Sequence, residues 1–144
     1  MSRMFSWLWV ATLSVGLVGC GKTYEGDERF PVSGKVSVDG KPLEMGVIAF
    51  MPKGGADGPG RVAGAPIRDG IYSVPEENGP TAATYQIQIH WNKRTGKKIP
   101  NPMDPEQMTD ELMEGLPARY HQNSELTADV SADKTQFDFD LQSQ

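Results

Sequence analysis

The stretch ATYQIQIHW, residues 83–91, alternates apolar and polar side chains from Tyr85 onward. The odd positions hold Tyr85, Ile87, Ile89 and Trp91, and the even positions hold Gln86, Gln88 and His90. A period of two is that of a β-strand, whose successive side chains point to opposite faces of a sheet. We therefore expect a strand here, with its aromatic face turned into a core.

The same alternation recurs on both sides of this stretch. It is found in residues 30–38, 126–130 and 135–141. Residues 47–51 (VIAFM) are a continuous apolar run, which predicts a more fully buried strand, and residues 65–68 and 71–74 predict a second hairpin. Asp39-Gly40 and Asp69-Gly70 are dipeptides that tolerate the positive φ angles of a type I′ hairpin turn. About seven short strands, with turn signals about every 8–12 residues, predict an all-β domain built as a β-sandwich.

Residues 92–117 interrupt this rhythm and read as an insert. The first part, NKRTGKKIPNP, is basic and extended. The second part, DPEQMTDELMEGLP, predicts one short helix with Asp104 as its N-cap, Pro105 in its first turn and Gly115 as its stop. Met108, Leu112 and Met113 fall at helical spacing and would pack the helix against the sheet.

Composition limits the size of the fold and the class of partner. The chain has 144 residues, enough for one domain, and 14 basic against 19 acidic residues give a formal charge of −5. Nucleic acid is excluded as a partner because its backbone requires a concentrated basic face. The 16 glycines and 11 prolines favour short strands over long helices. A single cysteine excludes an internal disulfide.

The first 19 residues carry the parts of a secretory signal peptide. Arg3 precedes an apolar run of about 15 residues, which is shorter than the roughly 20 needed to span a bilayer. The exit, Leu17-Val18-Gly19-Cys20, resembles the bacterial lipobox. That resemblance implies cleavage before Cys20, a thioether from its sulfur to diacylglycerol, and an acylated N-terminus that anchors by burying acyl CH₂ groups.

Two alternatives remain for this segment: an ordinary signal peptide, or a buried N-terminal helix with Cys20 in the core. On the lipoprotein interpretation residues 1–19 are the signal, residues 20–29 are a polar tether, and the domain spans residues 30–144. The protein is then held in the cell envelope, with its domain facing the periplasm or the exterior. The choice between inner and outer membrane stays open.

Several short motifs together resemble a known domain family. They are VSGKV (32–36), DGKPL (39–43), GVIAF (46–50), DGIY (69–72), YQI (85–87) and LPARY (116–120). In this order they resemble carboxypeptidase-regulatory-like, or transthyretin-like (prealbumin-like), domains, and the match runs over roughly residues 30–141. The resemblance implies a Greek-key β-sandwich acting as a non-catalytic structural or protein-interaction module.

Catalysis has little support in the sequence. The hydroxyisourate hydrolases, an enzymatic branch of the transthyretin family, end in a Tyr-Arg-Gly-Ser-type tail, whereas this chain ends DFDLQSQ. His121 lies three residues before Ser124, so a Ser–His pair is conceivable, but no G-x-S-x-G turn surrounds the serine. We therefore expect no catalytic residues.

Metal and cofactor sites are also not expected. The two histidines and a lipid-modified cysteine cannot supply the four ligands of a structural zinc site. The acidic stretch from Asp104 to Glu114 lacks the ligand spacing of a calcium loop. The glycine-rich residues 52–64 form a loop without the Lys-Ser/Thr pair of a phosphate-binding loop.

The alternative function is binding of a carbohydrate or another envelope polymer. Trp91, Tyr85 and Tyr72 would supply an aromatic platform, although the first two share a face with isoleucines and core packing comes first. The basic residues Lys93, Arg94, Lys97 and Lys98 would contact anionic lipid headgroups or an acidic polymer, unless they are simply solvated.

Overall fold

The computed structural model describes residues 27–55 and 59–144, and this part of the chain is all-β. It contains nine strands and short 3-10 turns, without an α-helix in the described ranges. The strands are β1 (Val32–Val38), β2 (Lys41–Pro42), β3 (Met45–Pro52), β4 (Ala63–Arg68), β5 (Ile71–Val74), β6 (Ala83–Asn101), β7 (Asp104–Glu114), β8 (Thr127–Val130) and β9 (Phe139–Leu141). The named 3-10 turns are η2 (Glu76–Asn78) and η3 (Ala118–Tyr120).

Some expectations from the sequence concern residues outside these ranges. The signal peptide, Cys20 and tether residues 21–26 are among them, as are residues 56–58 of the glycine-rich loop. Of the expected tether, Arg29 forms a β-bridge with Thr81 and its side chain hydrogen bonds to the Glu77 carbonyl. The folded body therefore begins by residue 29.

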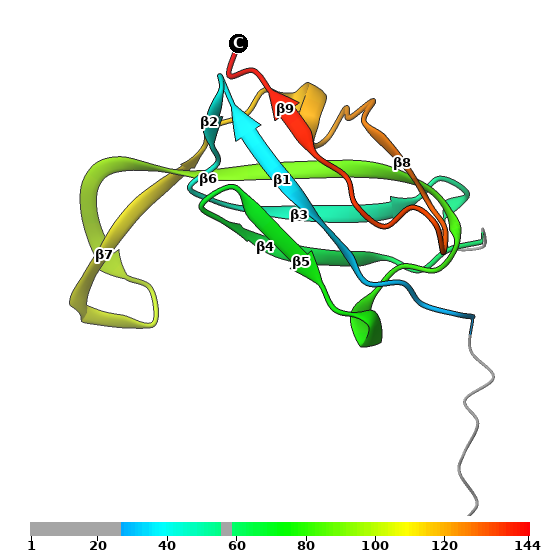
Figure 1. Ribbon diagram of the computed structural model, residues 1–144. Coiled ribbons are helices and arrows are strands. Elements are labelled where there is room, and N and C mark those ends of the chain that lie inside the picture. Colours follow the sequence, from blue (N-terminus) through cyan, green and yellow to red (C-terminus); the bar gives the residue numbers. More distant parts are fainter. Residues whose placement is uncertain (1–26, 56–58) are drawn as a thin grey trace, which may run out of the picture.

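The nine strands form one connected sheet that curls around a core. Its order is β2-β1-β5-β4-β3-β6-β7, with β8 added to β6 and β9 added to β1. All pairings between these strands are antiparallel except β1 with β9, which is parallel. Figure 1 shows β1, and the chain segment that leads into β9, passing in front of β6 and β3. Buried side chains of β1, β9, β3 and β6 belong to a single cluster, so β1 with β9 and β3 with β6 cover the same core.

The two Asp-Gly turns are as predicted. Asp39 and Gly40 have φ angles of 51° and 77°, and Asp69 and Gly70 have 50° and 76°. Both residues of each pair are therefore in the left-handed region that a type I′ turn requires. The flanking residues pair directly, Val38 with Lys41 and Arg68 with Ile71, so each dipeptide closes a hairpin.

The alternation in β6 is confirmed as a core face. Tyr85, Ile87 and Ile89 are fully buried, and Phe50 of the neighbouring strand β3 lies opposite Ile87 in the register. The Phe50 ring lies 6.0 Å from the Tyr85 ring and 6.2 Å from the Tyr72 ring, measured between centroids. Edge-on and tilted aromatic pairs at this separation are favourable beyond the area that they bury.

The expected helix in residues 104–114 is wrong, because this segment is strand β7. It pairs antiparallel with the second half of β6 and follows a tight turn at residues 102–103. An isolated helix of this length is marginal in water, while the extended basic segment before it offers backbone partners and opposite charges along most of its length. The count of strands rises accordingly, to nine instead of about seven, because β2 and β7 are added.

Candidate interaction surface

The second half of β6 and the whole of β7 project from the body as a two-stranded ribbon, residues 92–114, which we call the arm. Up to Trp91, β6 lies in the sheet beside β3. From Asn92 onward it pairs with β7 alone in the described chain. Figure 1 shows the arm standing clear of the curled sheet.

The arm carries most of the exposed large hydrophobic residues of the described chain. Seven such residues are exposed in the described ranges, and four of them belong to the arm: Met103, Met108, Leu112 and Met113. Met103 at the tip is 94% exposed and Met108 is 59% exposed. Exposed apolar side chains gathered in one place are typical of interaction sites, and methionine adapts readily to different partner shapes.

Charged side chains link the two strands of the arm. Asp110 lies 2.7 Å from the Lys98 ammonium and 3.3 Å from the Arg94 guanidinium. The hydrogen bond from Lys98, helped by the charge of Arg94, lowers the pKa of Asp110. On the opposite face, the Thr95 hydroxyl donates to Glu111 at 2.6 Å. These pairs hold β7 in register with β6 beyond the bulge between Arg94 and Lys98.

Glu114 fastens the base of the arm to the body. Its carboxylate accepts the backbone N–H groups of Trp91 and Leu116, both at 3.0 Å, and contacts His90 Nδ1 at 2.7 Å. Burial alone would raise the pKa of Glu114, but the two backbone hydrogen bonds and the contact with His90 outweigh it and lower that pKa. The carboxylate therefore stays ionised and fixes the point at which the arm leaves the sheet.

The two histidines meet at this base. Their rings stack with centroids 4.9 Å apart and an angle of 26° between the planes. His121 is buried, and its Nε2–H donates to the Leu116 carbonyl at 3.2 Å, while its Nδ1 has no hydrogen-bond partner in the described residues. Sequence reasoning treated these histidines separately, because nothing in their spacing indicates that they stack.

Ser124 is also buried, and its hydroxyl is fully engaged with the backbone. It donates to the Ile87 carbonyl and accepts the Leu126 N–H at 3.2 Å. In the described part of the chain no hydrogen bond joins this hydroxyl to the His121 imidazole, and the two residues are linked only by the Ser124 N–H, which donates to the His121 carbonyl at 3.4 Å. An attacking serine needs its proton directed at a base, and here that proton is directed at a backbone oxygen instead.

The three aromatic candidates do not share a surface. Tyr72 and Tyr85 are buried in the core, with their hydroxyls bonded to backbone groups of Phe137 and Thr81. Burial, with the charge of Asp138, raises the pKa of Tyr72. Trp91 alone is half-buried, and the Lys93 ammonium lies 5.2 Å from its ring centroid. A ligand on the surface can therefore reach Trp91 but neither tyrosine.

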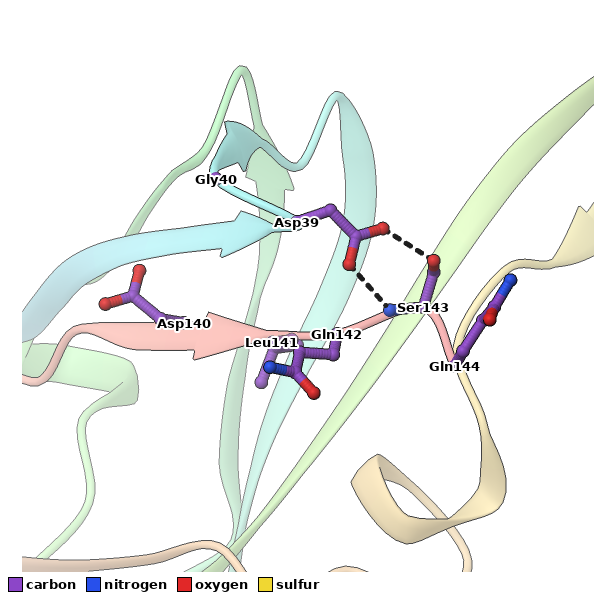
Figure 2. A pocket seen from close by; sticks show the side chains of 7 residues that line it. All are labelled: Asp39, Gly40, Asp140, Leu141, Gln142, Ser143 and Gln144. Atoms are coloured by element: carbon purple, nitrogen blue, oxygen red, sulfur yellow. Dashed lines mark hydrogen bonds between the residues drawn. The ribbon is translucent and has the colours of Figure 1, made fainter.

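An open hollow of about 570 Å³ lies where β1 ends and the chain runs out beyond β9 (Figure 2). The Asp39 carboxylate points across it and accepts the Ser143 hydroxyl at 2.5 Å and the Ser143 N–H at 3.1 Å. These two bonds lower the pKa of Asp39. Asp140 likewise accepts a bond from Ser37. The carboxylates here serve to hold the chain end, so we place the candidate site on the arm.

In residues 27–55 and 59–144, no three His, Cys, Asp or Glu side chains are grouped so that they could hold a metal ion. The same ranges contain no helix with the length and apolar character needed to cross a bilayer. Among known proteins, no family model matches the chain, and neither a curated protein nor a solved structure is significantly similar to it.

Proposed function

We propose that this protein is a lipid-anchored component of the bacterial cell envelope that binds another protein through its arm. One observation carries the proposal: four of the seven exposed large hydrophobic residues of the described chain lie on a ribbon that projects from the body. A ribbon of two strands buries little apolar surface of its own, and such surface is stabilised when a partner covers it.

For the body, we propose a Greek-key β-sandwich of the transthyretin-like or carboxypeptidase-regulatory-like kind, acting as a non-catalytic scaffold. Its support is the order of the motifs along the chain, together with the two Asp-Gly hairpins that they predicted. Glu114 then has a clear role, because its carboxylate fixes the base of the arm to the sheet from which the arm projects.

Two other functions have weaker support. A carbohydrate platform loses two of its three aromatic rings to the core and keeps only Trp91. A hydrolase would need His121 to activate Ser124, whose hydroxyl donates to the Ile87 carbonyl. Binding of an anionic polymer through Lys93 and Lys97 is the form of the polymer hypothesis that the geometry favours, because both side chains lie on the exposed arm.

Anchoring through Cys20 has a direct test. We expect Cys20→Ser protein to leave the membrane fraction or to keep its signal peptide uncleaved, because serine provides no thiol for the thioether. Cell fractionation and the mass of the N-terminal peptide measure this, with Ser14→Ala as a control inside the signal. A Cys20→Ser protein that is processed and membrane-bound like the wild type would overturn the anchoring proposal. Binding through the arm is tested separately, by the oxidation of its methionines in intact cells.

A further inference from the structure

The two strands of the arm carry opposite charge. Between residues 92 and 101, β6 has four basic and no acidic side chains: Lys93, Arg94, Lys97 and Lys98. Between residues 104 and 114, β7 has five acidic and no basic side chains: Asp104, Glu106, Asp110, Glu111 and Glu114. The arm is therefore a ribbon with one positive and one negative side.

One face of this ribbon combines apolar and ionic groups. Strand alternation and the β6–β7 register put Met108, Asp110 and Leu112 of β7 on the same face. Their cross-strand neighbours on β6 are Pro100, Lys98 and Arg94. The ion pairs of Asp110 lie between the exposed side chains of Met108 and Leu112, so the face is apolar at both ends and charged in the middle.

Such a surface fits a second copy of itself. Edge-to-edge pairing about a two-fold axis would join β6 to β6 or β7 to β7, which sets like charges side by side. Face-to-face stacking about a two-fold axis along the arm instead puts each basic strand over the acidic strand of the other copy. In that arrangement the two arms point the same way.

We propose that the arm is a self-association surface, through which two copies stack on the face that carries Met108 and Leu112. This deepens the proposed function, on which it rests, by naming the partner as a second identical chain. Apolar contacts hold the two faces together, and the opposite charges of β6 and β7 select this orientation and exclude edge pairing.

Charge exchange between chains tests the proposal. A β6 variant carries Lys97→Glu and Lys98→Glu, and a β7 variant carries Asp110→Lys and Glu111→Lys. Each variant alone places like charges across the stack, so we expect its dimer dissociation constant to rise by at least about tenfold. An equal mixture of the two restores opposite charges across the stack, and we expect it to form a heterodimer. The full-length proteins are measured in detergent, with micelles in large excess, by analytical ultracentrifugation.

The mixture separates recognition between copies from damage within one copy. Both variants lose the Lys98–Asp110 ion pair inside the arm, and mixing cannot repair that loss. Association that returns only in the mixture therefore supports stacking between copies. A wild-type protein that stays monomeric throughout, or a mixture that associates no better than each variant alone, overturns self-association. Protection of the arm in cells would in that case still support the proposed function, with a different protein as partner.

Discussion

Replacing Phe50 with alanine is expected to lower the free energy of unfolding by about 3–5 kcal/mol. Phe50 is fully buried in β3, and its ring lies 6.0–6.4 Å from those of Tyr72, Tyr85 and Phe137. These three rings come from β5, from β6 and from the segment before β9. Removing Phe50 leaves a cavity among parts of the sheet that are far apart in the sequence and that cannot all collapse into it.

Urea unfolding followed by tryptophan or tyrosine fluorescence measures this change. Val47→Ala is the matched control, because Val47 lies on the same strand and is 43% exposed. We expect the control to cost less than about 1 kcal/mol, as surface substitutions usually do. A Phe50→Ala protein as stable as the control would show that this ring is not at the centre of the core.

Gly34→Ala is expected to be the second most damaging change, at about 3 kcal/mol, the upper end of typical overpacking costs. A Cβ atom at this position would lie 1.8 Å from the Phe137 carbonyl oxygen and 2.9 Å from the Tyr72 hydroxyl. The Tyr72 hydroxyl donates to that same carbonyl at 2.8 Å. Because a backbone oxygen cannot rotate out of the way, the segment leading into β9 would have to separate from β1.

The neighbouring Ser33→Ala change provides the control for Gly34→Ala, because the Ser33 side chain is exposed and the substitution adds no atom to it. We expect hydrogen exchange of the β9 amides to accelerate in Gly34→Ala and to stay unchanged in Ser33→Ala. Equal protection of β9 in both variants would contradict the close packing of β1 against Phe137.

Most strands and turns of the body can be predicted from the sequence. The alternation in β1 and β6 predicted which side chains are buried, because one face of each strand covers the core. The apolar run in β3 predicted a more fully buried strand, but Val47 is 43% exposed there. The Asp-Gly pairs predicted two hairpins because both of their residues tolerate positive φ. Such signals are local, and they predict the structure correctly here because the tertiary packing favours the same conformation of those residues.

The arm was misread because its pattern fits two periods. Met108 and Leu112 are four residues apart, which places them on one face of a helix and equally on one face of a strand. Asp104 and Pro105 resemble a helix start, but Pro is also tolerated at the beginning of an edge strand. What decides between them is the partner strand, residues 92–101, whose basic side chains pair with Asp110. The spacing of apolar residues within 104–114 carries no information about that partner strand.

The candidate site was only partly predicted, because several of its residues come together only through the pairing of β7 with β6. Tyr85 packs into the core as its strand face predicts, and Tyr72 is buried as well, whereas Trp91, expected on the same core face as Tyr85, is only half-buried at the base of the arm. Glu114 and the stacked pair of His90 and His121 went unrecognised. These residues are brought together by the end of β7 and by η3, which follow from the arm's hairpin and not from any local spacing.

We propose that the arm is the surface through which this protein contacts its partner, and methionine oxidation tests that proposal most directly. Met103, Met108 and Met113 are exposed in the isolated chain, so dilute peroxide will convert them to sulfoxides rapidly in the purified, diluted protein. Intact cells treated in the same way are then compared by mass spectrometry, with the partly buried Met45 as an internal reference. We predict that oxidation of Met108, relative to Met45, is several-fold slower in the envelope because a partner covers the face of the arm that carries Met108. Equal relative rates in cells and in dilute solution would contradict the account.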